Sequence, residues 1–174
     1  MTVGATRVAI DGDSWMINGK PTYEGRTYRD WKIEGLLLNS RMANALFDDT
    51  NEVTRSLWRY PDSGDWDPDR NTSEFVAMLP EYREQGLLAV TVNLQGAAPF
   101  GYYRLPEFRE YLRSLGVDRP DGEIWSGLPS PESQPWHNSA FDADGALTQP
   151  HLDRLTTVLG CADELGMVVI LGLF

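Results

Sequence analysis

The sequence is poor in the residues that build metal centres and covalent cross-links. It has one cysteine, Cys161, and two histidines, His137 and His151, among 174 residues. A single cysteine cannot form an internal disulfide, and two histidines cannot supply a poly-histidine metal site. A chain without disulfides suits the cytoplasm. We therefore expect no metal, no other cofactor and a cytoplasmic location, with Cys161 as a small core residue and His151 at the surface.

Basic residues and long apolar runs are also scarce. Lys and Arg number 15 against 26 Asp and Glu, which gives a formal net charge of −11. Negative charge of this size repels nucleic-acid phosphates and anionic membranes. No apolar run is long enough to cross a bilayer, and the first residues lack the apolar core of a secretion signal. We expect neither nucleic acid nor membrane as a partner, and the oligomeric state stays open.

Aromatic residues, by contrast, are abundant, and several stand in loops. Hydrophobic residues make up 41% of the chain and aromatic residues 11%, with six tryptophans. Trp58, Trp66 and Trp125 are candidates for stacking on a ligand, although packing beneath long loops explains them better. The acidic tracts 65–69 and 142–145 resemble calcium loops but lack the glycine or glutamate that such loops need. We interpret both tracts as turn and helix-cap chemistry.

The N-terminal residues predict an antiparallel β-hairpin cap. Residues 8–10 and 14–17 read as short strands around the turn Asp11-Gly12-Asp13, and Asn18-Gly19 opens a second hairpin. Residues 1–31 are therefore expected to form a cap with its linker, and residues 32–174 the main domain.

The main domain alternates between strand and helix patterns. Buried strands are expected at residues 35–41, 87–96 and 167–174. Helices are expected at 72–85, 106–115 and 150–165, the first capped by Thr72 and kinked or divided by Pro80. Alternation of this kind predicts a parallel sheet in an α/β fold.

Loop lengths suggest which parallel fold this is. Long loops follow the strands and very short ones follow the helices, which is typical of a (β/α)8 barrel. A doubly wound sheet is the alternative, but residues 39–44 lack the glycines of its phosphate-binding turn. The expected fold is thus a partial TIM barrel, comprising about its first three parallel strands. The last apolar run, 167–174, is typical of a strand covered on both faces, so we expect the chain to be the N-terminal part of a larger protein.

Polar residues at the expected carboxyl ends of strands are the candidate binding residues. Amide, imidazole and guanidinium groups beside an aromatic face suit the hydroxyl groups and C–H surface of a sugar. Asn39 and Asn93 alternatively tie down loop backbone, and His137 alternatively is a core histidine. The candidates are Asn39, Ser40, Arg41, Asn93, Gln95, Trp136, His137 and Asn138.

Four segments resemble a known family. Residues 17–21 (Ile-Asn-Gly-Lys-Pro), 33–42, 134–142 and 162–174 are similar to a bacterial branch of the cellulase-like (β/α)8 glycoside hydrolases, a clan of retaining glycosidases. The Ile-Asn-Gly-Lys-Pro segment resembles the entry hairpin that precedes the first barrel strand in that family. The resemblance implies a carbohydrate substrate bound at the carboxyl ends of the strands.

The family resemblance also implies where catalysis resides. The clan uses an acid/base glutamate after strand four and a nucleophilic glutamate after strand seven. Both positions lie beyond residue 174, so this chain by itself is expected to be inactive, and the larger protein is expected to cleave or bind a glycan. The alternatives are a non-catalytic carbohydrate-binding or structural barrel, and a complete small α/β binding domain.

Overall fold

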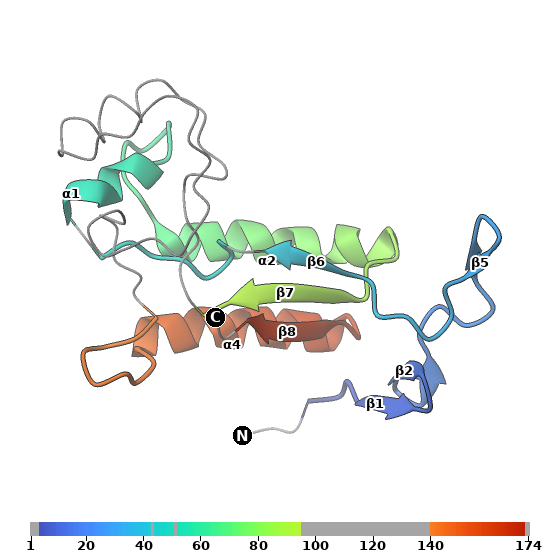
Figure 1. The fold of residues 1–174 in the computed structure, drawn as a ribbon. Coiled ribbons are helices and arrows are strands. Elements are labelled where there is room, and N and C mark those ends of the chain that lie inside the picture. Colours follow the sequence, from blue (N-terminus) through green and yellow to red (C-terminus); the bar gives the residue numbers. More distant parts are fainter. Residues whose placement is uncertain (1–3, 43, 51, 95–139, 173–174) are drawn as a thin grey trace, which may run out of the picture.

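The computed structural model describes residues 4–42, 44–50, 52–94 and 140–172 (Figure 1). Within these ranges the chain forms two antiparallel sheets near its N-terminus and one three-stranded parallel sheet. Two long helices pack on the parallel sheet. The antiparallel sheets lie beside the amino ends of the parallel strands, at the opposite end from the loop that contains the short helix α1 (Glu52–Arg55).

The N-terminal sheets are built from tight turns. Strands β1 (Val8–Asp11), β2 (Ser14–Ile17) and β3 (Lys20–Pro21) pair antiparallel, with Val8 opposite Ile17 and Met16 opposite Pro21. Asn18 and Gly19 both have positive φ angles, 51° and 77°, as a primed hairpin turn requires. Strands β4 (Thr27–Tyr28) and β5 (Trp31–Lys32) form a separate two-stranded sheet.

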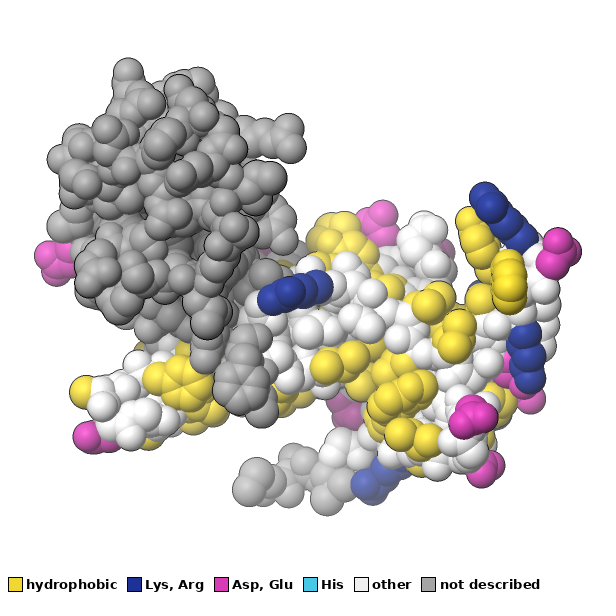
Figure 2. Space-filling model, viewed as in Figure 1, with side chains coloured by type: hydrophobic (Ala, Val, Ile, Leu, Met, Phe, Trp, Pro, Cys, Tyr) yellow, Lys and Arg dark blue, Asp and Glu magenta, His cyan; other side chains and the backbone are white. Residues whose placement is uncertain are grey.

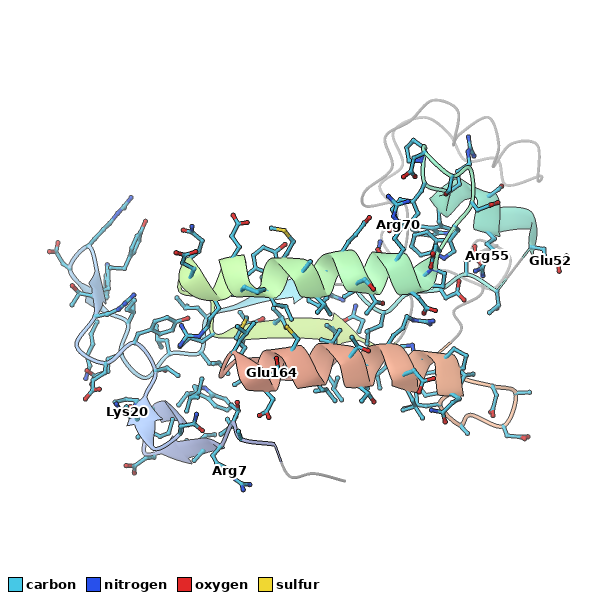
Figure 3. The ribbon with its side chains drawn as sticks, turned by 180° about the vertical axis from the view of Figure 1, so that it is seen from behind. Arg7, Lys20, Glu52, Arg55, Arg70 and Glu164 are labelled. Carbon is cyan, nitrogen blue, oxygen red and sulfur yellow. The ribbon has the colours of Figure 1, made fainter. Side chains whose placement is uncertain are left out.

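The parallel sheet has the order β6 (Asn39–Met42), β7 (Ala89–Asn93), β8 (Val168–Gly172). Its register places Arg41 beside Thr91 and Thr91 beside Ile170. Helices α2 (Pro68–Glu84) and α4 (Gln149–Glu164) both lie on one face of this sheet, as the two opposite views show (Figures 1 and 3).

The core lies between this sheet and the two helices. Because side chains alternate along a strand, every second residue of β7 points toward the helices. Val90 and Val92 are fully buried there and belong to the two clusters that include Leu79 of α2 and Val158 of α4. No helix in the described ranges combines the length and the apolar character that a membrane span needs.

Helix α2 begins earlier than its sequence pattern predicts. The side chain of Asp67 accepts hydrogen bonds from the amides of Asp69 and Arg70, and Pro68 occupies the first turn, where its missing N–H costs nothing. Thr72 is therefore not the cap but a buried residue inside the helix. Pro80 does not divide α2, which continues to Glu84. Helix α4, by contrast, lies within one residue of its predicted bounds at each end.

The expected partial barrel with a hairpin cap is wrong. The described residues form three separate sheets, and the N-terminal part is a three-stranded sheet followed by a two-stranded one. A barrel closes its strands into a ring with a packed interior. Here Asn39 and Arg41, on the sheet face away from the helices, are exposed, and the order β6-β7-β8 leaves β6 and β8 as edges among the described strands. Alternation and loop length predicted the parallel pairing, but closure depends on contacts that neither encodes.

The face of the molecule away from the helices exposes apolar side chains. Figure 2 shows hydrophobic groups on this side, over the N-terminal sheets and the parallel sheet. Leu36 and Leu38, which precede β6, are 46% and 47% exposed, and Trp31 of β5 is 77% exposed. Leu36 and Leu38 were not predicted to face solvent, because the run 35–41 reads as a buried strand.

Candidate functional site

The first strand of the parallel sheet lies further along the chain than predicted, and this changes the position of Asn39. The expected strand at 35–41 would place Asn39 at its carboxyl end, whereas Asn39 is the first residue of β6. The cause is a clasp around Gly35 to the N-terminal sheet. The Gly35 amide donates to the Thr22 carbonyl, and the Gly35 carbonyl accepts from the Trp15 amide, both at 2.8 Å. Backbone held in this way cannot join β7.

Three candidate residues lie on one face of the parallel sheet. Asn39, Arg41 and Asn93 alternate with the helix-facing residues, so they share the opposite face. The Thr91 hydroxyl donates to Asn39 Oδ1 at 2.9 Å, which ties neighbouring strands together. Ser40 lies on the helix side of β6. The candidates Gln95, Trp136, His137 and Asn138 lie outside the described residues.

Asn93 is held at the carboxyl end of β7 by close packing on β8. A Cβ built on Gly172, its partner across the two strands, would stand 2.6 Å from Asn93 Oδ1. The glycine therefore leaves the space that the amide occupies. Of the predicted carboxyl-end residues that the structure describes, Asn93 alone lies where the sequence placed it.

Arg41 also borders a groove between the β6 edge and helix α2. We call it the β6 groove; its volume is about 410 Å³. Phe75 and Tyr82 of α2 contribute aromatic rings to its wall. Its polar lining residues are Arg41, Asn44, Asn71 and Glu74. Asn39 and Asn93 do not line it, so the structure places the predicted residues in two locations.

Asn44 is the most unusual polar group in the β6 groove. Its Oδ1 is buried and has no hydrogen-bond partner in the described part of the chain. Its backbone carbonyl, in contrast, accepts from Asn71 Nδ2 at 2.8 Å. Arg41 forms no ion pair with any described residue. The groove thus presents the exposed Arg41 as a cation that no described residue pairs, while the unpartnered Asn44 oxygen is closed to solvent.

A charged network closes the end of the groove near the start of α2. Glu74 accepts from the Tyr60 hydroxyl at 3.0 Å and from Arg70 Nε at 2.9 Å. The Arg70 guanidinium lies 3.8 Å from the Tyr60 ring centroid and also pairs with Asp62 at 2.9 Å. Burial and the Glu74 carboxylate raise the pKa of Tyr60 to about 12, so this hydroxyl stays protonated at neutral pH. Figure 3 shows Arg70 at this end of α2.

The loop after β6 is organised by two adjacent carboxylates. Trp58 Nε1 donates to Asp49 Oδ2 at 3.1 Å, and Trp66 Nε1 donates to Asp48 Oδ1 at 3.0 Å. The ring of Trp58 lies 4.4 Å from that of Phe47, and Trp58 is only 7% exposed. Trp58 and Trp66 therefore pack beneath the loop, which is the role that the sequence analysis favoured over stacking on a ligand. Trp125 lies outside the described residues. The sequence pattern did not reveal the role of Asp48 and Asp49, which have no local spacing that marks them as indole acceptors.

His151 is not at the surface as expected. It is 1% exposed in the first turn of α4, and neither of its ring nitrogens has a hydrogen-bond partner among the described residues. Burial, followed by the charge of Arg154, lowers the pKa of His151. Arg154 is itself buried, and its Nη1 lies 3.3 Å from Asp69 Oδ1. The imidazole is thus kept neutral in the core.

Metal-binding chemistry is not evident in the described residues. They contain no group of three His, Cys, Asp or Glu side chains that could hold an ion. Asp67 of the first acidic tract caps α2, and Asp142 of the second accepts from the amides of Asp144 and Ala146 at 2.9 Å. Both tracts therefore serve as cap and turn, as their sequences predict.

Comparison with known proteins identifies no relative of this chain. No protein-family model, no curated protein and no solved structure matches the chain significantly.

Proposed function

We propose that the chain binds a carbohydrate in the β6 groove. The observation that carries the proposal is the combination of the unpaired Arg41 and aromatic rings in one groove. The Arg41 guanidinium can bond sugar hydroxyls, and Phe75 and Tyr82 offer apolar surface to sugar C–H groups. A volume of about 410 Å³ is within the range of small-ligand sites.

The residues of the groove favour binding over hydrolysis. A retaining glycosidase places two carboxyl groups about 5–5.5 Å apart. Glu74 is the one carboxylate among the described residues lining the groove, and it already accepts from Tyr60 and Arg70. The groove therefore supports recognition of a glycan, while the resemblance to glycoside hydrolases supplies the expectation that the ligand is a carbohydrate.

The test measures glycan binding to variants of the groove. The chain is screened on a broad glycan array, and the best ligands, with cello-oligosaccharides included, are titrated by calorimetry. Arg41→Ala should weaken binding about tenfold, because it removes hydrogen bonds to the ligand that together contribute about 1.4 kcal/mol. Asn44→Ala should leave the affinity unchanged, because the oxygen that it removes is closed to solvent. Removing an unpartnered oxygen at Asn44 should leave the fold intact.

Arg7→Ala is the matched control. Arg7 is also an exposed arginine, but it lies on the N-terminal sheet away from the groove (Figure 3). Its variant should bind as the wild type does. Absence of any ligand on the array, or equal affinity in all the variants, refutes the proposal.

A further inference from the structure

A second cavity lies at the other end of the parallel sheet. It lies between the N-terminal sheet on one side and the end of α2 with the segments that lead into β7 and β8 on the other. Its volume is about 500 Å³. We call it the hairpin pocket. Its charged residues are Lys20, Glu24, Arg26, Arg83 and Glu84. Figure 3 shows Lys20 on the N-terminal sheet, on the side where the parallel strands begin.

The three cations of the hairpin pocket are not neutralised by the protein groups that the structure describes. Lys20 and Arg26 form neither an ion pair nor a side-chain hydrogen bond with a described residue. Arg83 donates through Nε to the Leu165 carbonyl at 3.1 Å, and no described residue accepts from its two terminal nitrogens. With Glu24 and Glu84 counted, the lining of the cavity carries one net positive charge, in a chain whose net charge is −11.

Tyr23 lines the same pocket as these cations. Its hydroxyl donates to the Gly86 carbonyl at 3.0 Å, which anchors the ring across the pocket. Burial raises the pKa of Tyr23, while a backbone hydrogen bond with Leu88 and, more weakly, the charges of Arg83 and Arg26 lower it. Arg26 and Arg83 both line this cavity. Guanidinium groups that line one cavity suit an oxyanion, which each can bind through two parallel hydrogen bonds.

We propose that the hairpin pocket binds a small ligand that carries a phosphate or carboxylate group. Arg26 and Arg83 hold the anionic group, with Lys20 adding charge at the rim. Glu24 and Glu84 accept from hydroxyl or amino groups of the same ligand. The volume of about 500 Å³ suits a ligand of metabolite size. The inference is independent of the β6 groove, because the two cavities share no residue.

The test titrates inorganic phosphate and citrate into the chain at constant ionic strength, with chloride as the reference salt. We expect saturable binding of one or both, at a dissociation constant of ~1 mM or tighter. Phosphate binding alone identifies a phosphorylated ligand, and citrate binding alone a carboxylated one. Saturable binding of neither overturns the proposal.

Variants then locate the site. Arg26→Gln and Arg83→Gln should each weaken binding at least ~10-fold, because each removes a charge-assisted pair of hydrogen bonds. Glu24→Gln should tighten it ~3-fold by removing a repulsive charge. Arg83→Gln also loses the bond to Leu165, so Arg26→Gln, which loses no hydrogen bond to a described residue, keeps the test decisive if the former misfolds.

Arg7→Gln is the control for non-specific attraction. Arg7 does not line the pocket, so its variant removes the same charge from another part of the N-terminal sheet. Binding that falls equally in Arg7→Gln and Arg26→Gln, or that weakens in Glu24→Gln, overturns the proposal.

Discussion

Replacing Gly35 by alanine should loosen the N-terminal sheet from the rest of the molecule. Gly35 has a φ angle of +81°, and a Cβ there would stand 2.5 Å from Ser14 Oγ and 3.1 Å from Ser14 Cα. The first contact can be relieved by rotating the serine, but the second involves backbone. Gly35 is also bonded on both sides, to Thr22 and to Trp15, so the segment cannot shift without losing those hydrogen bonds.

The magnitude follows from two separate costs. A left-handed backbone costs a residue with a Cβ about 1–2 kcal/mol, and forcing a methyl group into packed space costs about 1–3 kcal/mol more. The free energy of unfolding should therefore fall by about 2–5 kcal/mol. Gly12→Ala is the matched control, because Gly12 also has a positive φ, +56°, and no atom within 4 Å of its built Cβ. The Gly12→Ala variant should therefore lose only the stability that the left-handed backbone costs.

Two measurements check this prediction. The free energies of unfolding of the two variants, from urea denaturation, should differ by about 1–3 kcal/mol, which for a chain of this size corresponds to about 2–12 °C in Tm. Native-state hydrogen exchange should show faster exchange of the Trp15, Thr22 and Gly35 amides in Gly35→Ala. Equal stability of the two variants, with unchanged protection of these amides, would refute the clasp.

Two further predictions concern buried polar groups. Asp49→Ala should lower the free energy of unfolding by about 2–4 kcal/mol, because it removes a fully buried acceptor and its hydrogen bond with the Trp58 indole N–H. Exposed Asp11→Ala should change the urea midpoint little, and equal effects would contradict the assignment. His151→Leu should remove the part of the acid-induced loss of stability that protonation of His151 causes. The pKa of His151 is lower in the folded state than in the unfolded state. Below about pH 6.5 the unfolded chain therefore binds a proton at His151 that the folded chain does not, and the free energy of unfolding decreases as the pH is lowered, at a limiting slope of about 1.4 kcal/mol per pH unit. Urea midpoints between pH 7 and 5 should fall more in the wild type than in the variant, and parallel curves would show that His151 does not titrate in this way.

The candidate site was only partly predictable. Arg41 was chosen because polar residues follow an apolar run, and it does border a groove, but from the middle of β6 rather than from its end. Asn44 and Asn71 were missed because no periodicity marks them, and they become neighbours only when the loop after β6 packs on α2. The hairpin pocket was likewise not predictable, since Arg26 and Arg83 lie far apart in the sequence and line one cavity only in the folded chain.

By itself, the sequence determined the elements whose signals are local. The three- and four-residue spacing of apolar side chains defined α4, the continuous branched run defined β8, and Asn18-Gly19 defined a hairpin turn. Only the tertiary structure decided where β6 begins, that His151 is buried, and that the strands form an open three-stranded sheet with separate N-terminal sheets instead of part of a barrel. The physical reason is the range of the interactions. Helices and turns are specified by neighbours within a few residues, whereas strand start, burial and sheet closure are set by contacts between distant segments, such as the bonds between Gly35 and the N-terminal sheet.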